Sequence, residues 1–127
     1  MIHLDTSVLI DALTGPRRSG PRLRQLIHDG ERISLSSIVA FEWRRGPRTS
    51  EELSDQESLF PIPDSIPFGP EEAIVAAESY RKVKRPRGRE IDIAIAASAI
   101  VHNAILWTLN PDDFKDILKL RLLPARG

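Results

Sequence analysis

Short apolar runs alternate with helix-like segments along this chain of 127 residues. Runs that suit buried strands lie at residues 2–4, 32–35, 105–109 and 118–123. Helical patterns, bounded by capping residues, glycine or proline, cover residues 6–13, 21–28, 38–45, 50–60, 70–82 and 90–102. Strands separated by helices favour βαβ units, in which the helix returns the chain so that the next strand is parallel. We therefore predict an α/β fold with three layers: a mostly parallel central sheet flanked by helices on both faces.

The stretch between the fourth and fifth helical patterns is rich in proline, at Pro61, Pro63 and Pro67. Proline is stiff and has no N–H to donate, so residues 62–68 are expected to be extended and at most an edge strand. The chain contains no internal repeat and no linker, and its length suits one domain. We expect a single domain over residues 1–127.

Composition excludes several classes of protein. Cysteine is absent, which excludes a disulfide framework and thiolate metal sites. No apolar run approaches the ~18 residues that a membrane-spanning helix needs. The first residues show no basic leader of a signal peptide. We expect a cytoplasmic protein that does not enter a membrane.

The net charge of zero, from 18 basic and 18 acidic residues, conceals a strong segregation of charge. Residues 49–80 hold eight acids and no lysine or arginine, whereas bases cluster at 17–24, 44–48 and 81–89. The last cluster contains Arg81, Lys82, Lys84, Arg85, Arg87 and Arg89. It is either a solvated surface or a site for a polyanion, because like charges repel unless they are neutralised. Net charge therefore does not exclude a nucleic-acid partner.

Acidic side chains occur where the surrounding sequence is apolar or where a strand ends. Asp5 directly follows the first strand, and Asp112 and Asp113 follow the third. Glu42 lies inside an apolar helix, and Asp92 lies in the first turn of the most apolar helix. The carboxyl ends of parallel strands form the ligand-binding edge of such a sheet. Burying several carboxylates together is costly unless a cation neutralises them, and hard cations such as Mg²⁺ and Mn²⁺ prefer oxygen ligands.

Most of these acids could also serve a purpose that needs no metal. Asp5 could cap the helix that follows it, and Asp92 could be a first-turn acid at the positive end of a helix dipole. Asp112 and Asp113 suit a turn on their own account, whereas Glu42 in mid-helix gains nothing from capping. Zinc is not indicated, because no metal-ligand spacing is found among the histidines, which are His3, His28 and His102.

This ordered set of acids resembles that of the PIN-domain ribonucleases, and within them the VapC-type toxins of type II toxin–antitoxin systems. The likeness is carried by residues 2–11, 36–42, 91–99 and 106–114. It spans nearly the whole chain and includes the opening Asp-Thr-Ser and an Asp followed by small and apolar residues. The resemblance implies a single PIN-like domain over residues 1–127.

The resemblance implies that Asp5, Glu42 and Asp92 are catalytic and ligate one or two Mg²⁺ or Mn²⁺ ions. The family's fourth acid falls in the turn after the third strand, where Asn110 stands at the position of an aspartate in many relatives. Asp113, rather than the aspartate before it, is then the expected fourth ligand. Supporting roles are implied for Thr6, Ser7, Thr108 and Asn110.

The activity implied by the resemblance is metal-dependent hydrolysis of RNA phosphodiester bonds, by which a toxin would inhibit translation or growth. The substrate would be a transfer RNA or a ribosomal RNA, and the basic residues 81–89 would contact its phosphates. The implied partners are a VapB-type antitoxin and a second copy of the chain in a homodimer.

Other functions are open on the sequence alone. A PIN-like domain could bind nucleic acid without cleaving it, or act as a non-toxin nuclease on other RNA or on DNA, although an intact acid set argues against a pure binding module. A receiver-type phospho-acceptor domain has a similar length and sheet. It requires paired acids after its first strand and a lysine after its fifth, whereas this chain has one acid after the first strand and no lysine directly after Thr108.

Overall fold

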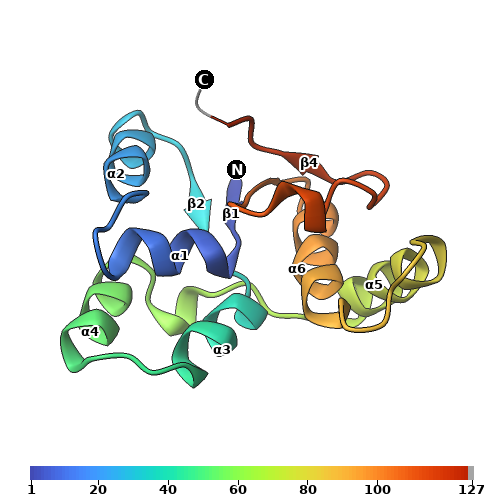
Figure 1. The fold of residues 1–127 in the computed structure, drawn as a ribbon, viewed down its shortest axis with the longest axis horizontal. Coiled ribbons are helices and arrows are strands. Elements are labelled where there is room, and N and C mark those ends of the chain that lie inside the picture. Colours follow the sequence, from blue (N-terminus) through green and yellow to red (C-terminus); the bar gives the residue numbers. More distant parts are fainter. Residues whose placement is uncertain (126–127) are drawn as a thin grey trace.

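The computed structural model describes residues 1–125, which form six helices, four strands and two short 3-10 turns (Figure 1). Their order is β1 (Ile2–Leu4), α1 (Thr6–Leu13), α2 (Gly20–His28), β2 (Ile33–Ser34), α3 (Ser37–Arg45), α4 (Ser50–Leu59), η1 (Ile62–Asp64), α5 (Pro70–Lys82), α6 (Glu90–Val101), β3 (Ile105–Trp107), η2 (Pro111–Asp113) and β4 (Arg121–Leu122). Residues 126 and 127, the end of the domain expected from the sequence, lie outside the described residues. The expected helices and strands are all present, with small differences in their ends.

The four strands form one parallel sheet in the order β2-β1-β3-β4. β1 is internal, because Ile2 pairs with Ile33 of β2 on one side and with Ile105 of β3 on the other. In Figure 1, β1 and β2 stand between a group formed by α1 to α4 and a pair formed by α5 and α6. The predicted parallel α/β architecture is confirmed. Its consequence for the site is that the carboxyl ends of β1 and β3 lie side by side.

The core is built around β1, β3 and α6. Leu4 and Leu106, in the two central strands, are fully buried. α6 contacts β3, α3 and α5, and its run of buried small side chains, which includes Ala96 and Ala99, permits this close approach. A helix that is apolar on nearly every side belongs inside a protein. Within residues 1–125, no helix is both long enough and apolar enough to cross a membrane.

The proline-rich segment, expected to be extended and at most an edge strand over residues 62–68, is only partly extended. Its first part, Ile62–Asp64, is the 3-10 turn η1, and the pairing that follows is one isolated parallel bridge between Ser36 and Ile66. Ile66 donates its N–H to the carbonyl of Leu35 and accepts from the N–H of Ser37. The pairing does not grow into a strand, because Pro67 directly follows Ile66 and has no N–H with which to extend a hydrogen-bonded ladder.

Two strands are shorter than expected. β3 ends at Trp107 instead of residue 109, because the N–H of Asn110 donates to the hydroxyl of Thr108 and turns the chain. β4 covers Arg121–Leu122 instead of residues 118–123. Lys119 has a φ of 70°, in the left-handed region, which interrupts an extended strand.

Candidate functional site

Asp5 lies at the carboxyl end of β1 and is almost completely buried, with 5% of its surface exposed. Its Oδ2 atom accepts hydrogen bonds from Ser7 Oγ at 2.7 Å and from Thr108 Oγ1 at 2.8 Å. Asp5 is also the N-cap residue of α1, yet its side chain makes no capping hydrogen bond. The carboxylate is therefore held by two hydroxyl groups in place of the helix end.

Both hydroxyl groups are themselves oriented by backbone N–H groups of the loop after β3. Leu109 donates to Ser7 Oγ at 3.1 Å, and Asn110 donates to Thr108 Oγ1 at 3.0 Å. A hydroxyl that accepts in this way directs its own hydrogen elsewhere, here to the carboxylate of Asp5. This network joins the ends of β1 and β3. It leaves Oδ1 of Asp5 without a hydrogen-bond donor among residues 1–125.

Glu42 projects from α3 toward the beginning of α1. Its Oε1 atom accepts a 2.6 Å hydrogen bond from Thr6 Oγ1, and its Oε2 atom lies 3.3 Å from an Nη atom of Arg45. The Glu42 side chain is 19% exposed, while that of Arg45 is 55% exposed. The helix that carries Glu42 is capped by Ser36, whose hydroxyl accepts from the N–H of Val39.

Asp92 lies in the first turn of α6 and is half-buried. No protein group within residues 1–125 donates a hydrogen bond to its carboxylate. Burial, followed by the negative charges of Asp5, Asp113 and Glu42, raises the pKa of Asp92 to about 6, and Arg89 acts in the opposite direction. Four acids from separate parts of the sequence therefore share one electrostatic environment.

The turn after β3 distinguishes the candidates for the fourth acid. Asp113 is among the charges that act on Asp92, whereas Asp112 is not. The Asp112 side chain is 86% exposed and pairs with Lys115. Asn110 contributes its backbone N–H to Thr108, and its side chain makes no hydrogen bond to any of the four acids. Of the two aspartates, Asp113 is therefore the one whose charge acts on Asp92, and its role as the fourth ligand stays a prediction.

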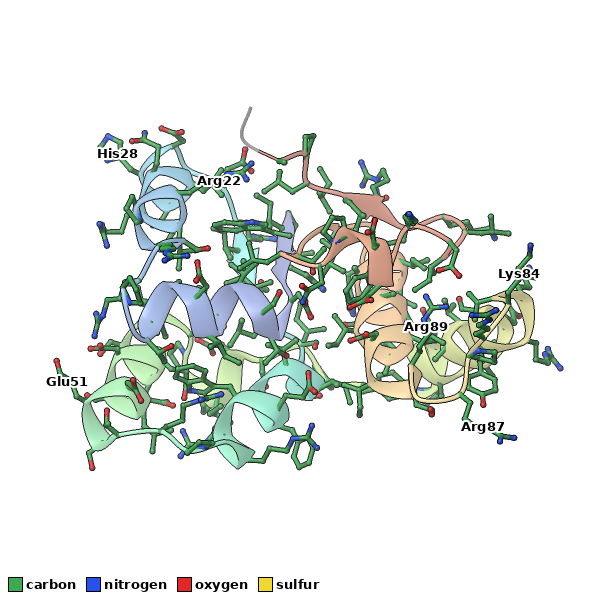
Figure 2. All side chains as sticks on the ribbon, viewed as in Figure 1. Arg22, His28, Glu51, Lys84, Arg87 and Arg89 are labelled. Atoms are coloured by element: carbon green, nitrogen blue, oxygen red, sulfur yellow. The ribbon has the colours of Figure 1, made fainter. Side chains whose placement is uncertain are left out.

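The basic residues 81–89 do not behave as one group. The exposed members, which form no ion pair within residues 1–125, are Arg81, Lys82, Lys84, Arg85 and Arg87. Figure 2 shows Lys84 and Arg87 at the outer end of α5, with Arg89 closer to α6. Arg89 is bound to Asp116 instead of being free. Glu51 on α4 lies at the opposite end of the molecule from these bases (Figure 2). The acidic and basic stretches of the sequence are nevertheless mixed in space, because Asp55 of α4 pairs with Arg17, and α5 carries both Glu78 and Arg81.

The chemistry of the four carboxylates fits a hard divalent cation, because all their donor atoms are oxygen and the charges of three of them raise the pKa of the fourth, Asp92. Their geometry is not that of a closed coordination shell. Within residues 1–125, no three His, Cys, Asp or Glu side chains converge on one point as metal ligands. The acids are neighbours, and binding a cation requires some of their side chains to turn toward it.

Sequence reasoning missed two ion pairs near the acids, Arg45 with Glu42 and Arg89 with Asp116. Arg45 stands three residues after Glu42 on the same helix, a spacing that brings side chains together and could have been recognised. Asp116 pairs with Arg89 across 27 positions, and no local pattern indicates that contact.

The profile of a family described as "PIN domain" matches residues 2–120 of the chain. Ribonuclease VapC1 of Methanocaldococcus jannaschii is 37% identical over 126 residues, which cover 95% of this chain and 84% of that protein. Ribonuclease VapC19 of Mycobacterium tuberculosis is 33% identical over 116 residues, 87% of this chain and 90% of that protein. Among solved structures, VapBC2 from Rickettsia felis bound to a DNA fragment from its promoter aligns with a TM-score of 0.76 at 25% identity, covering 99% of this chain and all of the matched chain.

Proposed function

Since the chain belongs to the PIN domain family, and within it to the VapC-type ribonucleases, we propose that it is a metal-dependent endoribonuclease that acts as the toxin of a toxin–antitoxin pair. The observation that supports this proposal is the proximity of acids from separate segments: Thr6, next to Asp5, donates a hydrogen bond to Glu42, and the charges of Asp5, Asp113 and Glu42 act on Asp92. A lone strand-end acid could serve as a helix cap or a turn residue. Four neighbouring carboxylates, of which only Glu42 forms an ion pair within residues 1–125, favour a site for a cation.

In this proposal the four acids hold Mg²⁺ or Mn²⁺. When bound, the cation supplies the acidification of a water molecule and the neutralisation of charge on the scissile phosphate. Ser7 and Thr108 hold Oδ2 of Asp5, so that its other oxygen is available as a ligand. Hydroxyl donors orient a carboxylate without neutralising its charge, which preserves its affinity for a cation.

RNA binding is assigned to the exposed bases of the 81–89 segment. Arginine and lysine contacts to phosphates position a nucleic acid without reading its sequence. These side chains have no carboxylate partner within residues 1–125, so a phosphate can take that place. Binding through them should weaken as salt is added, because counterions compete for both surfaces.

The partners follow from the relatives. The Rickettsia felis structure is of a VapBC complex. We propose that this chain is likewise bound by a VapB-type antitoxin, forms a homodimer, and acts in the cytoplasm on transfer or ribosomal RNA to inhibit translation. One domain over residues 1–127 would carry the whole activity.

The proposal is tested with the purified chain and total cellular RNA, in MgCl₂ or MnCl₂ and in EDTA. Sequencing of 5′-phosphorylated ends locates the cuts. We expect cleavage only with metal, and none by Asp5→Asn. Asp64→Asn is a matched control, because this aspartate is exposed in η1 and is not among the charges that act on Asp92. Full cleavage by Asp5→Asn at saturating metal would overturn the assignment of the site.

The toxin role is tested by inducing the gene in a bacterial host. The wild-type chain should arrest growth, Asp5→Asn should relieve the arrest, and co-expression of a small neighbouring gene that encodes a DNA-binding protein should also relieve it. Equal arrest by the wild type and Asp5→Asn would show that killing does not depend on the acids. RNA binding without cleavage under any metal condition would favour a binding module instead.

A further inference from the structure

The side chain of Arg89, near the acidic site, makes three hydrogen bonds to the turn that follows β3. Its Nη1 and Nη2 atoms lie 3.0 Å and 2.6 Å from the two carboxylate oxygens of Asp116. Nη2 also donates to the backbone carbonyl of Asp113 at 2.8 Å. The Arg89 side chain is 21% exposed, and the two-pronged pair lowers the pKa of Asp116. A bidentate arginine–carboxylate pair of this kind fixes orientation as well as distance.

The contact joins the two segments that bear two of the acids. Arg89 is the N-cap residue of α6 and stands three positions before Asp92. Asp116 and the Asp113 carbonyl belong to the turn that begins at η2. The Asp113 carboxylate is exposed and accepts no hydrogen bond within residues 1–125. Its placement therefore depends on its backbone, which is held by buried Phe114 on one side and by Arg89.

We propose that Arg89 is a positioning residue of the acidic site, which holds the Asp113 segment against the start of α6 through Asp116 and the Asp113 carbonyl. This inference rests on the proposed function. It gives Arg89 a different role from that of its basic neighbours, which we propose bind the phosphates of RNA. A phosphate could recruit Arg89 only by breaking the pair with Asp116, whereas Arg87 is exposed and has no such partner within residues 1–125.

The two roles predict different kinetic changes. A residue that binds an RNA phosphate should affect KM and its dependence on salt. Its loss should reduce the slope of the logarithm of the RNA affinity against the logarithm of the salt concentration by about 1. A residue that positions a ligand carboxylate should affect kcat and the affinity for metal. Outer partners of metal ligands typically change these by about 10- to 100-fold. Arg89→Gln is therefore compared with Arg87→Gln, which removes a base two positions away.

We expect Arg89→Gln to lower kcat by about 10-fold or more, with little change in KM for RNA. Asp116→Asn should cause a smaller loss of the same kind, because Arg89 keeps its contact with the Asp113 carbonyl. The double variant should be no worse than Arg89→Gln, because the pair with Asp116 is already broken in that variant. Arg89→Lys should be intermediate, since an ammonium group keeps the charge but cannot make the two-pronged contact. Arg87→Gln should raise KM several-fold and leave kcat unchanged.

A second measurement does not depend on RNA cleavage. Binding of Mn²⁺ to the RNA-free protein, followed by electron paramagnetic resonance, should weaken several-fold in Arg89→Gln and Asp116→Asn and stay at the wild-type value in Arg87→Gln. Thermal melting identifies any variant that fails to fold. If Arg89→Gln is such a variant, the kcat and Mn²⁺ affinity of Arg89→Lys and Asp116→Asn test the role of Arg89 in its place. The inference is overturned if the wild type cleaves RNA and Arg89→Gln changes KM alone with Mn²⁺ affinity intact. A wild type that neither binds Mn²⁺ nor cleaves RNA would instead overturn the proposed function, and this inference with it.

Discussion

The hydroxyl of Thr6 donates a 2.6 Å hydrogen bond to Oε1 of Glu42, which joins the first residue of α1 to α3 across 36 positions. Thr6 directly follows Asp5, so the same short segment carries one acid and orients a second. Asp5 is held in a comparable way by Ser7 and Thr108. Asp5 and Glu42 are therefore both oriented by hydroxyl groups, which donate a hydrogen bond without cancelling the negative charge of the carboxylate.

Thr6→Val tests this relationship with a side chain of nearly the same shape that cannot donate. We expect the rate of RNA cleavage to fall about 10-fold, because Glu42 loses the donor that orients it. Thr6→Ser retains a hydroxyl and should keep most of the activity. Initial rates at saturating metal provide the measurement.

A matched control lies on the same helix. Within residues 1–125, the hydroxyl of Thr14, the C-cap residue of α1, bonds only to the carbonyl of Ile10. Thr14→Val should therefore cleave at the wild-type rate. Equal rates for Thr6→Val and the wild type would show that Glu42 does not need this donor.

The identity of the fourth acid is tested by a pair of adjacent substitutions. Asp113 acts electrostatically on Asp92, whereas Asp112 is exposed and paired with Lys115. Asp113→Asn should weaken metal binding and reduce cleavage by about 10-fold or more, and Asp112→Asn should retain the wild-type rate. Metal titrations of the cleavage rate compare the two variants, and the reverse ranking would assign the role to Asp112.

The parts of the fold that could be predicted from the sequence are those with a local cause. The first helix begins after a strand-end acid and ends before Gly15, and the structure places it over the expected residues, Thr6–Leu13. The same holds for the acids, because Glu42 in an apolar helix is a local anomaly that the sequence displays. The parallel order of the strands follows from the alternation of elements.

The features that could not be predicted depend on contacts between distant residues. The pairing of Arg89 with Asp116 has no counterpart in spacing or composition, so the sequence alone groups Arg89 with its exposed basic neighbours. The prolines at 61–67 predicted an extended segment, but they could not show that its pairing is limited to one β-bridge between Ile66 and Ser36. The net charge of zero was similarly uninformative, because a sum of charges does not show which groups pair with each other, as Arg89 and Asp116 do, and which have no partner within residues 1–125.

The repulsion among the acids makes a prediction about stability without metal. The pKa of Asp92 is raised from 3.8 to about 6 in the folded protein. The folded state therefore favours the protonated form, and stability is lost as the pH rises from about 4 through 6. Asp92→Asn should then be more stable than the wild type at pH 8 in EDTA. Solvent screening at this half-buried site limits the gain to on the order of 1 kcal/mol, or a few degrees in Tm.

The matched comparison for Asp92→Asn is the same melt at pH 4, where the wild-type carboxyl is already protonated and the gain should vanish. Adding Mg²⁺ at pH 8 should raise the Tm of the wild type more than that of the variant, since ligand binding to the folded state stabilises it. An Asp92→Asn protein that is less stable than the wild type at pH 8 in EDTA would contradict the repulsion derived from the structure.

Burial of His3 predicts that stability falls as the pH is lowered, the opposite of the pH dependence expected from Asp92. The ring of His3 is 1% exposed, has no hydrogen-bond partner within residues 1–125, and lies 5.9 Å from the ring of His102. Burial, His102 and the amino terminus lower the pKa of His3 from 6.5 to about 4. The unfolded chain therefore binds a proton more readily, and stability should be lost as the pH falls from 6.5 toward 4, by about 1.4 kcal/mol for each pH unit. Urea unfolding at pH 7, 6 and 5 should show this loss in the wild type and in His28→Gln, which alters an exposed histidine, but much less of it in His3→Leu. A parallel decline in all three proteins would show that His3 is not the group responsible.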